Sequence, residues 1–174
     1  MVTLGLDAST NCVGYAFTKD EKILDMGFID ISKQKTPKEK VFRVIETLNE
    51  NSYIDETYHI NIEDNLSGFA GGRTSQQVIV KLAKFNAVLC FMLEDMFEMR
   101  VHNINPMTAR KNVFGKARVK GIKAKDLVKM KIEEMYNTKK WCKETTRGNW
   151  DKRNIDAYDG LVMSLFENKA WLIY

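Results

Sequence analysis

The first thirty-one residues contain three short apolar segments separated by turns, and this pattern constrains the fold more than any other feature of the sequence. Residues 2–7 and 12–18 flank a polar Ala-Ser-Thr-Asn turn, and residues 22–31 follow a Lys-Asp-Glu turn. Short apolar runs bounded by polar turns predict consecutive antiparallel strands. We therefore expect the chain to begin with a three-stranded antiparallel sheet.

The rest of the chain alternates between helical and strand patterns. Apolar spacing predicts helices at 38–50, 74–97, 107–113, 123–136 and 154–168, and strands at 59–63 and 101–104. Strands that follow crossover helices pair in parallel. The predicted fold is therefore α/β, a mixed five-stranded sheet of three antiparallel strands and then parallel strands, with helices on both faces. The length of 174 residues fits one domain, 1–174.

Composition argues against a membrane or secreted protein. Hydrophobic residues make up 44% of the sequence, but no apolar run approaches the roughly 18 residues that span a bilayer. The first residues lack the basic and apolar regions of a signal peptide. Cys12, Cys90 and Cys142 show no CxxC spacing, so we expect reduced thiols in the cytoplasm and neither a disulfide nor a zinc framework.

Basic residues concentrate in one part of the chain. Residues 107–154 contain 15 Lys or Arg and 5 Asp or Glu, a local net charge of +10. The other 126 residues contain 12 Lys or Arg and 18 Asp or Glu, a net charge of −6. Such a block predicts a polyanionic partner, because each phosphate contact releases condensed counterions. A solvated basic face would have the same composition.

Asp7 and Glu63 each end an apolar strand, where a carboxylate is costly unless it is paired or bound to a cation. Asp7 could alternatively cap the following turn, which contains Ser9. Asp64 would point to the opposite face from Glu63 if the strand continues, so only one of this pair can face Asp7. We choose Glu63 because it alternates with two apolar residues of its strand.

Asp156 and Asp159 are three residues apart in the last predicted helix and therefore share one face. Like charges this close repel each other unless a cation lies between them, although acids are also common in a first helical turn. Together with Asp7 and Glu63 they provide the carboxylates that Mg²⁺ or Mn²⁺ prefers. Two ions about 4 Å apart at such a site can activate a water and stabilise the leaving oxygen in phosphodiester hydrolysis.

The segments that contain these acids resemble the RuvC family of Holliday junction resolvases, particularly its bacteriophage members. They are Leu-Gly-Leu-Asp-Ala-Ser-Thr-Asn-Cys-Val-Gly-Tyr at 4–15, Ile62-Glu63, and Asn-Ile-Asp-Ala-Tyr-Asp-Gly-Leu at 154–161. The resemblance covers nearly the whole chain. It implies a ribonuclease H-like fold and a metal-dependent endonuclease that resolves junctions and other branched DNA by paired nicks. The catalytic and metal-binding acids that it implies are Asp7, Glu63, Asp156 and Asp159.

The resemblance also implies contacts with DNA. Basic positions that the family places against scissile-site phosphates match Lys111 and Lys123, and the loop between them is longer and more basic here. The candidate DNA-binding residues are Lys111, Lys116, Arg118, Lys120 and Lys123. The family also inserts an aromatic residue into the junction shortly after its catalytic Glu. The nearest match here is Leu66, with Phe69 three residues further on.

Two matched nicks in a four-way junction require two active sites, so one site per chain implies a two-fold homodimer. The helix at 74–97 is too apolar for one side alone, and in the family this helix forms the dimer interface. The residues expected to face the sheet are Val78, Leu82, Phe85 and Leu89. The residues expected to meet a partner are Val80, Ala83, Ala87 and Phe91.

Three other functions remain as alternatives. A ribonuclease H that cuts RNA–DNA hybrids would use the same carboxylates. An actin-like sugar or acetate kinase shares the Gly-x-Asp-x-Ser/Thr-Thr pattern at 5–10, but it needs two domains and a second phosphate-binding motif. A non-catalytic DNA-binding relative would be expected to lose acids, and all four are present. The expected location is the cytoplasm, that of a bacterial host if the protein is phage-encoded.

Overall fold

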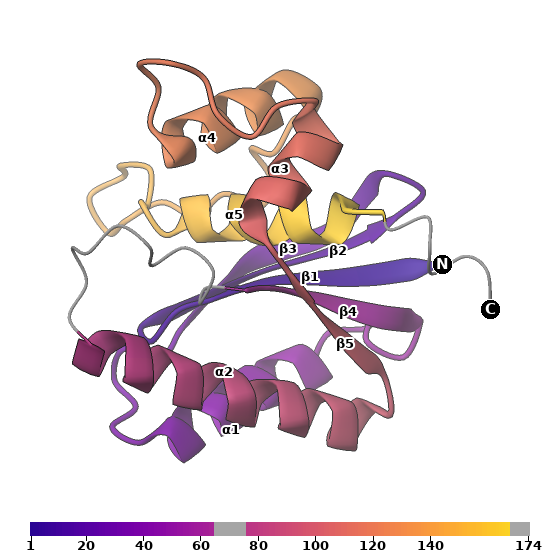
Figure 1. The fold of residues 1–174 in the computed structure, drawn as a ribbon, viewed down its shortest axis with the longest axis vertical. Helices are drawn as coiled ribbons and strands as arrows, with labels where there is room; N and C mark the ends of the chain where they lie inside the picture. Colours follow the sequence, from indigo (N-terminus) through magenta and orange to yellow (C-terminus); the bar gives the residue numbers. More distant parts are fainter. Residues whose placement is uncertain (65–75, 168–174) are drawn as a thin grey trace.

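The apolar segments form a five-stranded sheet in the order β3-β2-β1-β4-β5, drawn across the middle of Figure 1. The computed structural model describes residues 1–64 and 76–167. The strands are β1 (Val2–Ala8), β2 (Cys12–Lys19), β3 (Lys22–Asp30), β4 (Thr57–Glu63) and β5 (Arg100–Ile104). β1, β2 and β3 pair antiparallel, and β4 pairs in parallel with both β1 and β5. The predicted mixed sheet is therefore confirmed.

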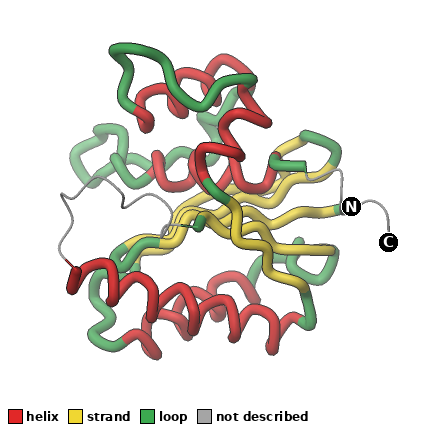
Figure 2. Tube along the Cα trace, viewed as in Figure 1, coloured by secondary structure: helices red, strands yellow, loops and turns green. Residues whose placement is uncertain are grey.

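Helices cover both faces of this sheet, as predicted. The helices are α1 (Pro37–Asn49), α2 (Gln76–Phe97), α3 (Pro106–Phe114), α4 (Ala124–Met135) and α5 (Asn154–Leu165). α1 and α2 lie under one face, whereas α5 lies on the other with α3 and α4 stacked above it (Figures 1 and 2). Each face has its own hydrophobic core, because alternate strand residues point to opposite sides.

α5 packs unusually close to the sheet because glycines lie beneath it. A Cβ atom added at Gly5 would overlap the backbone of α5 at Gly160 and Ser164, and one added at Gly14 would overlap the main-chain carbonyl of Asp156. Without a side chain at these positions, the helix backbone rests directly on β1 and β2. The first turns of α5 are therefore held against the end of β1 that carries Asp7.

α2 packs one side on the sheet and leaves the other side exposed. Its buried apolar residues are Leu82, Phe85, Leu89 and Leu93. Val78 was expected to face the sheet, but it is 46% exposed. Val78 lies in the first turn of α2, which extends past the end of the sheet (Figure 1), so no strand covers it.

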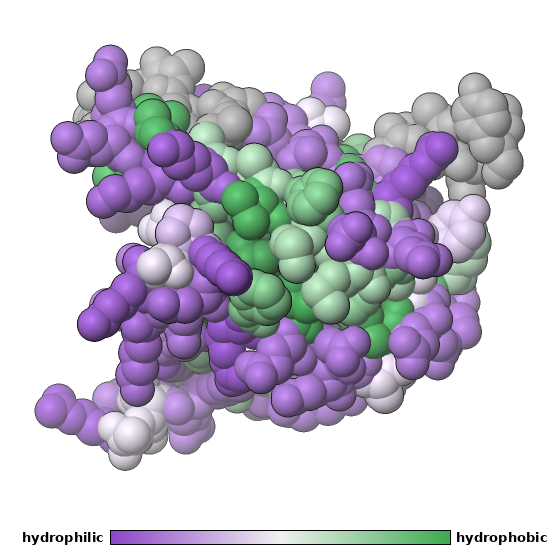
Figure 3. All heavy atoms as spheres, turned by 90° about the horizontal axis from the view of Figure 1, so that it is seen from below, coloured by the Kyte–Doolittle hydropathy of each residue, from purple (hydrophilic) through white to green (hydrophobic). Residues whose placement is uncertain are grey.

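The exposed side of α2 carries several large apolar residues beside charged ones such as Lys81 and Lys84. Its large exposed hydrophobic residues are Val78, Val80, Val88, Phe91 and Met96. From below, Figure 3 shows a hydrophobic area surrounded by polar side chains. By length and composition α2 is long and apolar enough to cross a membrane, contrary to the expectation that no apolar run approaches that length. One such helix is weak evidence for a membrane span; 28% of the apolar window of α2 is buried, and its buried stripe belongs to the core.

Candidate active site

β1 and β4 are neighbouring parallel strands, and they bring Asp7 and Glu63 to the same end of the sheet, where both strands finish. This end is called the active-site edge below. Leu6 pairs in parallel with Ile62, so the next residues lie side by side: Asp7, the last but one residue of β1, and Glu63, the last residue of β4. Asp7 is only 8% exposed. The turn that follows it is held by Ser9, whose hydroxyl donates to the Cys12 carbonyl at 2.8 Å and accepts from the Cys12 amide at 3.1 Å.

α5 brings Asp156 and Asp159 to this edge. Its first turn is anchored by the buried Asn154, whose side chain accepts a hydrogen bond from the Lys143 amide at 2.9 Å and donates one to the Lys143 carbonyl at 2.8 Å. The preceding Arg153 forms ion pairs with Asp151 and with Asp30 at the end of β3, each at 2.6 Å. These contacts, together with the glycines beneath the helix, fix where the two acids lie.

Two cationic side chains from the layer above reach the acids. The Lys125 ammonium of α4 lies 2.8 Å from an Asp156 oxygen and 3.9 Å from an Asp159 oxygen. The Arg110 guanidinium of α3 donates to the other Asp159 oxygen at 3.1 Å. Asp159 is 1% exposed and Arg110 is 8% exposed, so this ion pair is buried, whereas the Lys125 side chain is 57% exposed.

Burial and the charges of neighbouring carboxylates raise the pKa of Asp7 and of Glu63. Burial raises the pKa of Asp7 well above its usual value, and the charges of Glu63, Asp159 and Asp156 raise it further. Burial, followed by the charge of Asp159, raises the pKa of Glu63 to about 7. The pKa of Asp159 is also raised, because burial outweighs the nearby cationic groups.

The site fits a hard divalent cation in its donor chemistry. A positive ion among these four carboxylates would relieve their mutual repulsion, and carboxylate oxygens are the ligands that Mg²⁺ and Mn²⁺ prefer. The four side chains do not form a set of metal ligands in this structure. Within 1–64 and 76–167, no three Asp, Glu, His or Cys side chains are gathered in a way that could hold a metal ion. Lys125 and Arg110 instead contact the oxygens of the two acids on α5.

The two cations in contact with the acids are not among the residues that the sequence predicted to bind DNA, and that DNA-binding prediction stays a prediction. Lys111 and Lys123 are exposed, as are Lys116, Arg118 and Lys120 in the basic loop. Arg110 and Lys125, which the sequence interpretation missed, are neighbours of the predicted pair along the chain. The helical positions of α3 and α4 that point to α5 decide which basic residue reaches the acids. Leu66 and Phe69, the candidate junction wedge, lie outside the described residues.

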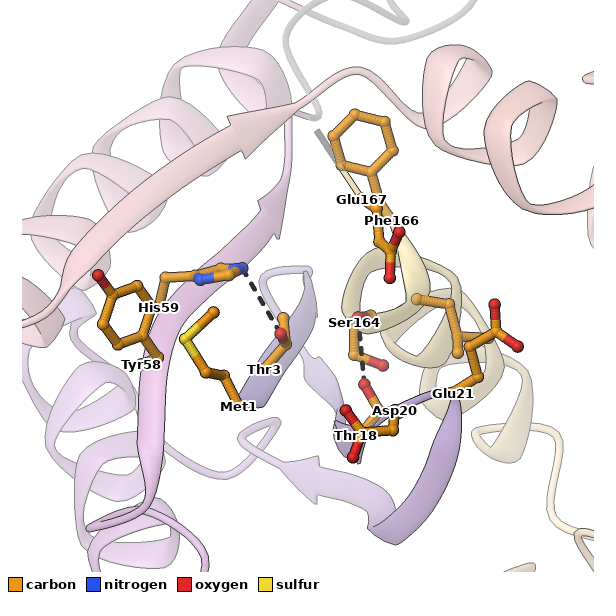
Figure 4. Close-up of a pocket in the computed structure, with 11 residues that line it drawn as sticks. Met1, Thr3, Thr18, Asp20, Glu21, Tyr58, His59, Ser164, Phe166 and Glu167 are labelled. Carbon is orange, nitrogen blue, oxygen red and sulfur yellow. Dashed lines mark hydrogen bonds between the residues drawn. The ribbon is translucent and has the colours of Figure 1, made fainter. Parts of the chain in front are cut away.

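One partly enclosed cavity in the described part of the chain lies away from these acids. It has a volume of about 190 Å³ and lies at the other end of β1, between Met1, Thr3, Tyr58, His59 and Phe166 (Figure 4). None of the four candidate acids lines it. The acids instead lie at the opposite end of β1, where Asp7 and Asp159 are buried and the side chain of Asp156 is 17% exposed.

The sheet order and the helices on its two faces define a ribonuclease H-like fold. No protein-family model matches the sequence, and a search of curated proteins found no match. Among solved structures, T. thermophilus RuvC in complex with a Holliday junction substrate has a TM-score of 0.61 at 13% sequence identity, over 95% of this chain and 90% of that chain. A second Thermus thermophilus RuvC structure has a TM-score of 0.59 at 17% identity, over 95% and 92%. The predicted resemblance to RuvC is confirmed at the level of the fold.

Proposed function

We propose that this protein is a structure-specific endonuclease that resolves Holliday junctions, and also cuts other branched DNA, by metal-dependent phosphodiester hydrolysis. One observation carries the proposal: Asp7, Glu63 and the two acids of α5 lie at one end of a RuvC-type fold, where the charges of Asp156 and Asp159 raise the pKa of Asp7 and of Glu63. The RuvC structure with this fold holds a Holliday junction substrate, which supports the same substrate class here.

The residues of the site have separate tasks in this proposal. Asp7, Glu63, Asp156 and Asp159 would hold two Mg²⁺ or Mn²⁺ ions, which when bound activate a water and stabilise the leaving 3′-oxygen. The buried Arg110 keeps its contact with Asp159 and fixes the orientation of that carboxylate. The exposed Lys125 can exchange Asp156 for a phosphate oxygen of the DNA, because its ammonium group lies at the open edge of the site.

The basic block would hold the DNA against this edge. The exposed residues Lys111, Lys116, Arg118, Lys120 and Lys123 belong to α3, α4 and the loop between them. Contacts of this kind position the DNA backbone without reading its sequence. The location that this function implies is the cytoplasm, that of a bacterial host if the protein is phage-encoded.

The proposal includes a homodimer formed through α2. Val80, Ala87 and Phe91, three of the four residues predicted to meet a partner, are exposed, and Ala83 is half-buried. Burying this apolar surface against its own copy would remove it from water and place two active sites in one particle. Two sites are what paired nicks on opposite strands require.

A panel of labelled substrates tests the proposed function. With Mg²⁺, the wild-type protein should cut four-way junctions faster than linear duplex, and EDTA should stop the reaction. Asp7→Asn should lower the cleavage rate by about a thousandfold or more, which corresponds to roughly 4 kcal/mol of transition-state stabilisation. Junction binding should change little, because phosphate contacts come mainly from Lys and Arg.

The same panel separates the alternatives. Preferred cleavage of an RNA–DNA hybrid would favour a ribonuclease H, which uses the same carboxylates. Junction binding without Mg²⁺-dependent cleavage would favour a non-catalytic DNA-binding protein. Cleavage by Asp7→Asn at nearly the wild-type rate would remove Asp7 from the mechanism.

A further inference from the structure

A second group of basic residues lies outside the basic block, at the start of α1. Residues 33–43 contain five Lys or Arg and one Asp or Glu, although the chain outside 107–154 is acidic as a whole. Lys33, Lys35, Lys38 and Arg43 are exposed. We call these four residues the α1 basic surface.

Few of these charges are neutralised locally. The one acid of the segment, Glu39, accepts hydrogen bonds from the backbone amides of Lys35 at 2.8 Å and Thr36 at 3.2 Å as part of the helix capping box. Arg43 forms an ion pair with Glu46 at 2.9 Å, and both side chains are largely exposed. Exposed ion pairs of this kind contribute little to stability, so Arg43 can exchange Glu46 for a phosphate group.

The surface is hollowed as well as basic. Lys33, Lys38 and Arg43 line an open groove of about 690 Å³ on α1, together with the acids Glu39 and Glu46. Phe42 lies in the same groove, is 49% exposed, and has the Lys38 ammonium 5.6 Å from its ring centroid. Cationic side chains around an exposed aromatic ring are suited to a nucleic acid backbone, in which phosphates alternate with less polar sugars.

The α1 basic surface lies at the active-site end of the molecule. The Lys40 ammonium donates a hydrogen bond to the Thr10 carbonyl, in the turn that begins shortly after Asp7. The Ile31 amide donates to the Asn11 carbonyl in the same turn at 3.0 Å. In Figure 1 the start of α1 and the start of α5 lie at the same end of the sheet, on opposite faces.

The α1 basic surface is also close to the basic block. Arg153, which belongs to that block, forms its 2.6 Å ion pair with Asp30 at the end of β3, and Lys33 follows three residues later in the chain. The acids at the sheet edge therefore have basic residues on both sides, from α3 and α4 above the sheet and from α1 below it.

We propose that the α1 basic surface binds the phosphate backbone of a DNA arm that leaves the active site on the side of α1. This inference rests on the proposed function, because it assumes that branched DNA is the substrate. Lys33, Lys38 and Arg43 contact successive phosphates, and Phe42 packs against the sugars between them. The surface holds an arm and takes no part in the hydrolysis.

The test compares two triple variants that lose the same charge. Lys33→Ala, Lys38→Ala and Arg43→Ala remove the α1 basic surface. Lys19→Ala, Lys22→Ala and Arg100→Ala remove three exposed charges at the opposite ends of β2, β3 and β5, roughly 20 Å away along the strands. Both are made in the Asp7→Asn background, so that the junction stays intact, and binding is followed by fluorescence anisotropy at several salt concentrations.

The α1 triple variant should bind a long-armed junction about tenfold or more weakly, and its log–log salt slope should be shallower by about 0.9 for each phosphate that the protein no longer neutralises. The matched variant at the opposite end should stay within about twofold of its parent, since its charges lie far from the DNA. Lys33→Arg, Lys38→Arg and Arg43→Lys, which keep the charges, should restore both the affinity and the slope.

Equal losses of affinity in the two triple variants would overturn the inference, because net charge alone would then explain the effect. With wild-type cleavage of junctions intact, that result would leave the proposed function standing. Absence of both junction binding and junction cleavage in the wild-type protein would overturn the proposed function and this inference together.

Discussion

The carboxylates at the sheet edge are held at a cost in stability. Three of them have raised pKa values in the folded protein, chiefly because burial disfavours their charged forms. In the unfolded chain these groups are solvated and regain their ordinary pKa. The folded protein therefore binds more protons than the unfolded chain over a range of weakly acidic pH.

The titration of Glu63 defines the pH range over which stability should change. Its pKa rises from 4.5 to about 7 on folding, so the free energy of unfolding should fall as the pH increases from about 4.5 to about 7. In EDTA, the melting temperature of the wild-type protein should decrease across this window relative to that of Glu63→Gln, which cannot titrate. Mg²⁺ should reduce the decrease by stabilising the ionised carboxylates. A constant difference between the two proteins across this window would contradict the raised pKa.

At the residue scale, the sequence predicts the acids better than their partners. Asp7 and Glu63 can be identified because each carboxylate follows apolar residues of a buried strand, where a charge is costly unless it has a partner. Arg110 and Lys125 carry no such local signal, since they are two among many basic residues of the block. Their role depends on how α3 and α4 stack on α5, which is a property of the tertiary structure.

At the scale of elements, the position of α5 determines the geometry of the site. α5 lies so close to β2 that a Cβ atom at Gly14 would overlap the Asp156 carbonyl. Gly14→Ala should therefore push α5 away from the sheet and separate its acids from Asp7. We expect a loss of roughly 1–3 kcal/mol in the free energy of unfolding, typical of overpacking, and a much larger proportional loss of cleavage rate.

Gly27→Ala is the matched control in the same sheet. The three atoms nearest to a Cβ atom there all belong to the side chain of Tyr15, the nearest at 3.0 Å, and this side chain can move slightly. Urea unfolding and junction cleavage should both stay near wild-type values for this control. If Gly14→Ala cleaves as fast as Gly27→Ala, close packing of α5 does not set the position of its acids.

The sequence predicts these elements well because their signals are local. Apolar alternation in 2–18 and helical spacing in 38–50 correspond to β1, β2 and α1 within a few residues. Val78 was misassigned because helical periodicity identifies a face of α2 but does not show where the sheet beneath it ends. Gly5 and Gly14 lie in apolar strands, and no local pattern shows that a helix backbone will rest on them.

At the scale of the whole molecule, the active-site edge lies between two surfaces of different chemistry. The basic helices α3 and α4 cover α5, whereas α2 presents an exposed apolar side on the opposite face of the sheet. The proposed dimer uses the apolar side and leaves the basic side for DNA. Ala87 is exposed on α2, so Ala87→Glu should disrupt the proposed interface without disturbing the core.

Cleavage of a supercoiled plasmid that extrudes a single cruciform tests the central claim most directly. Two nicks made within one binding event convert the plasmid straight to linear DNA, whereas independent nicks produce nicked circles first. With Mg²⁺, the wild-type dimer should yield linear DNA from the earliest times, and Ala87→Glu should yield mainly nicked circles. Wild-type protein that leaves the cruciform uncut, or that yields only nicked circles, would contradict a junction resolvase that acts as a dimer.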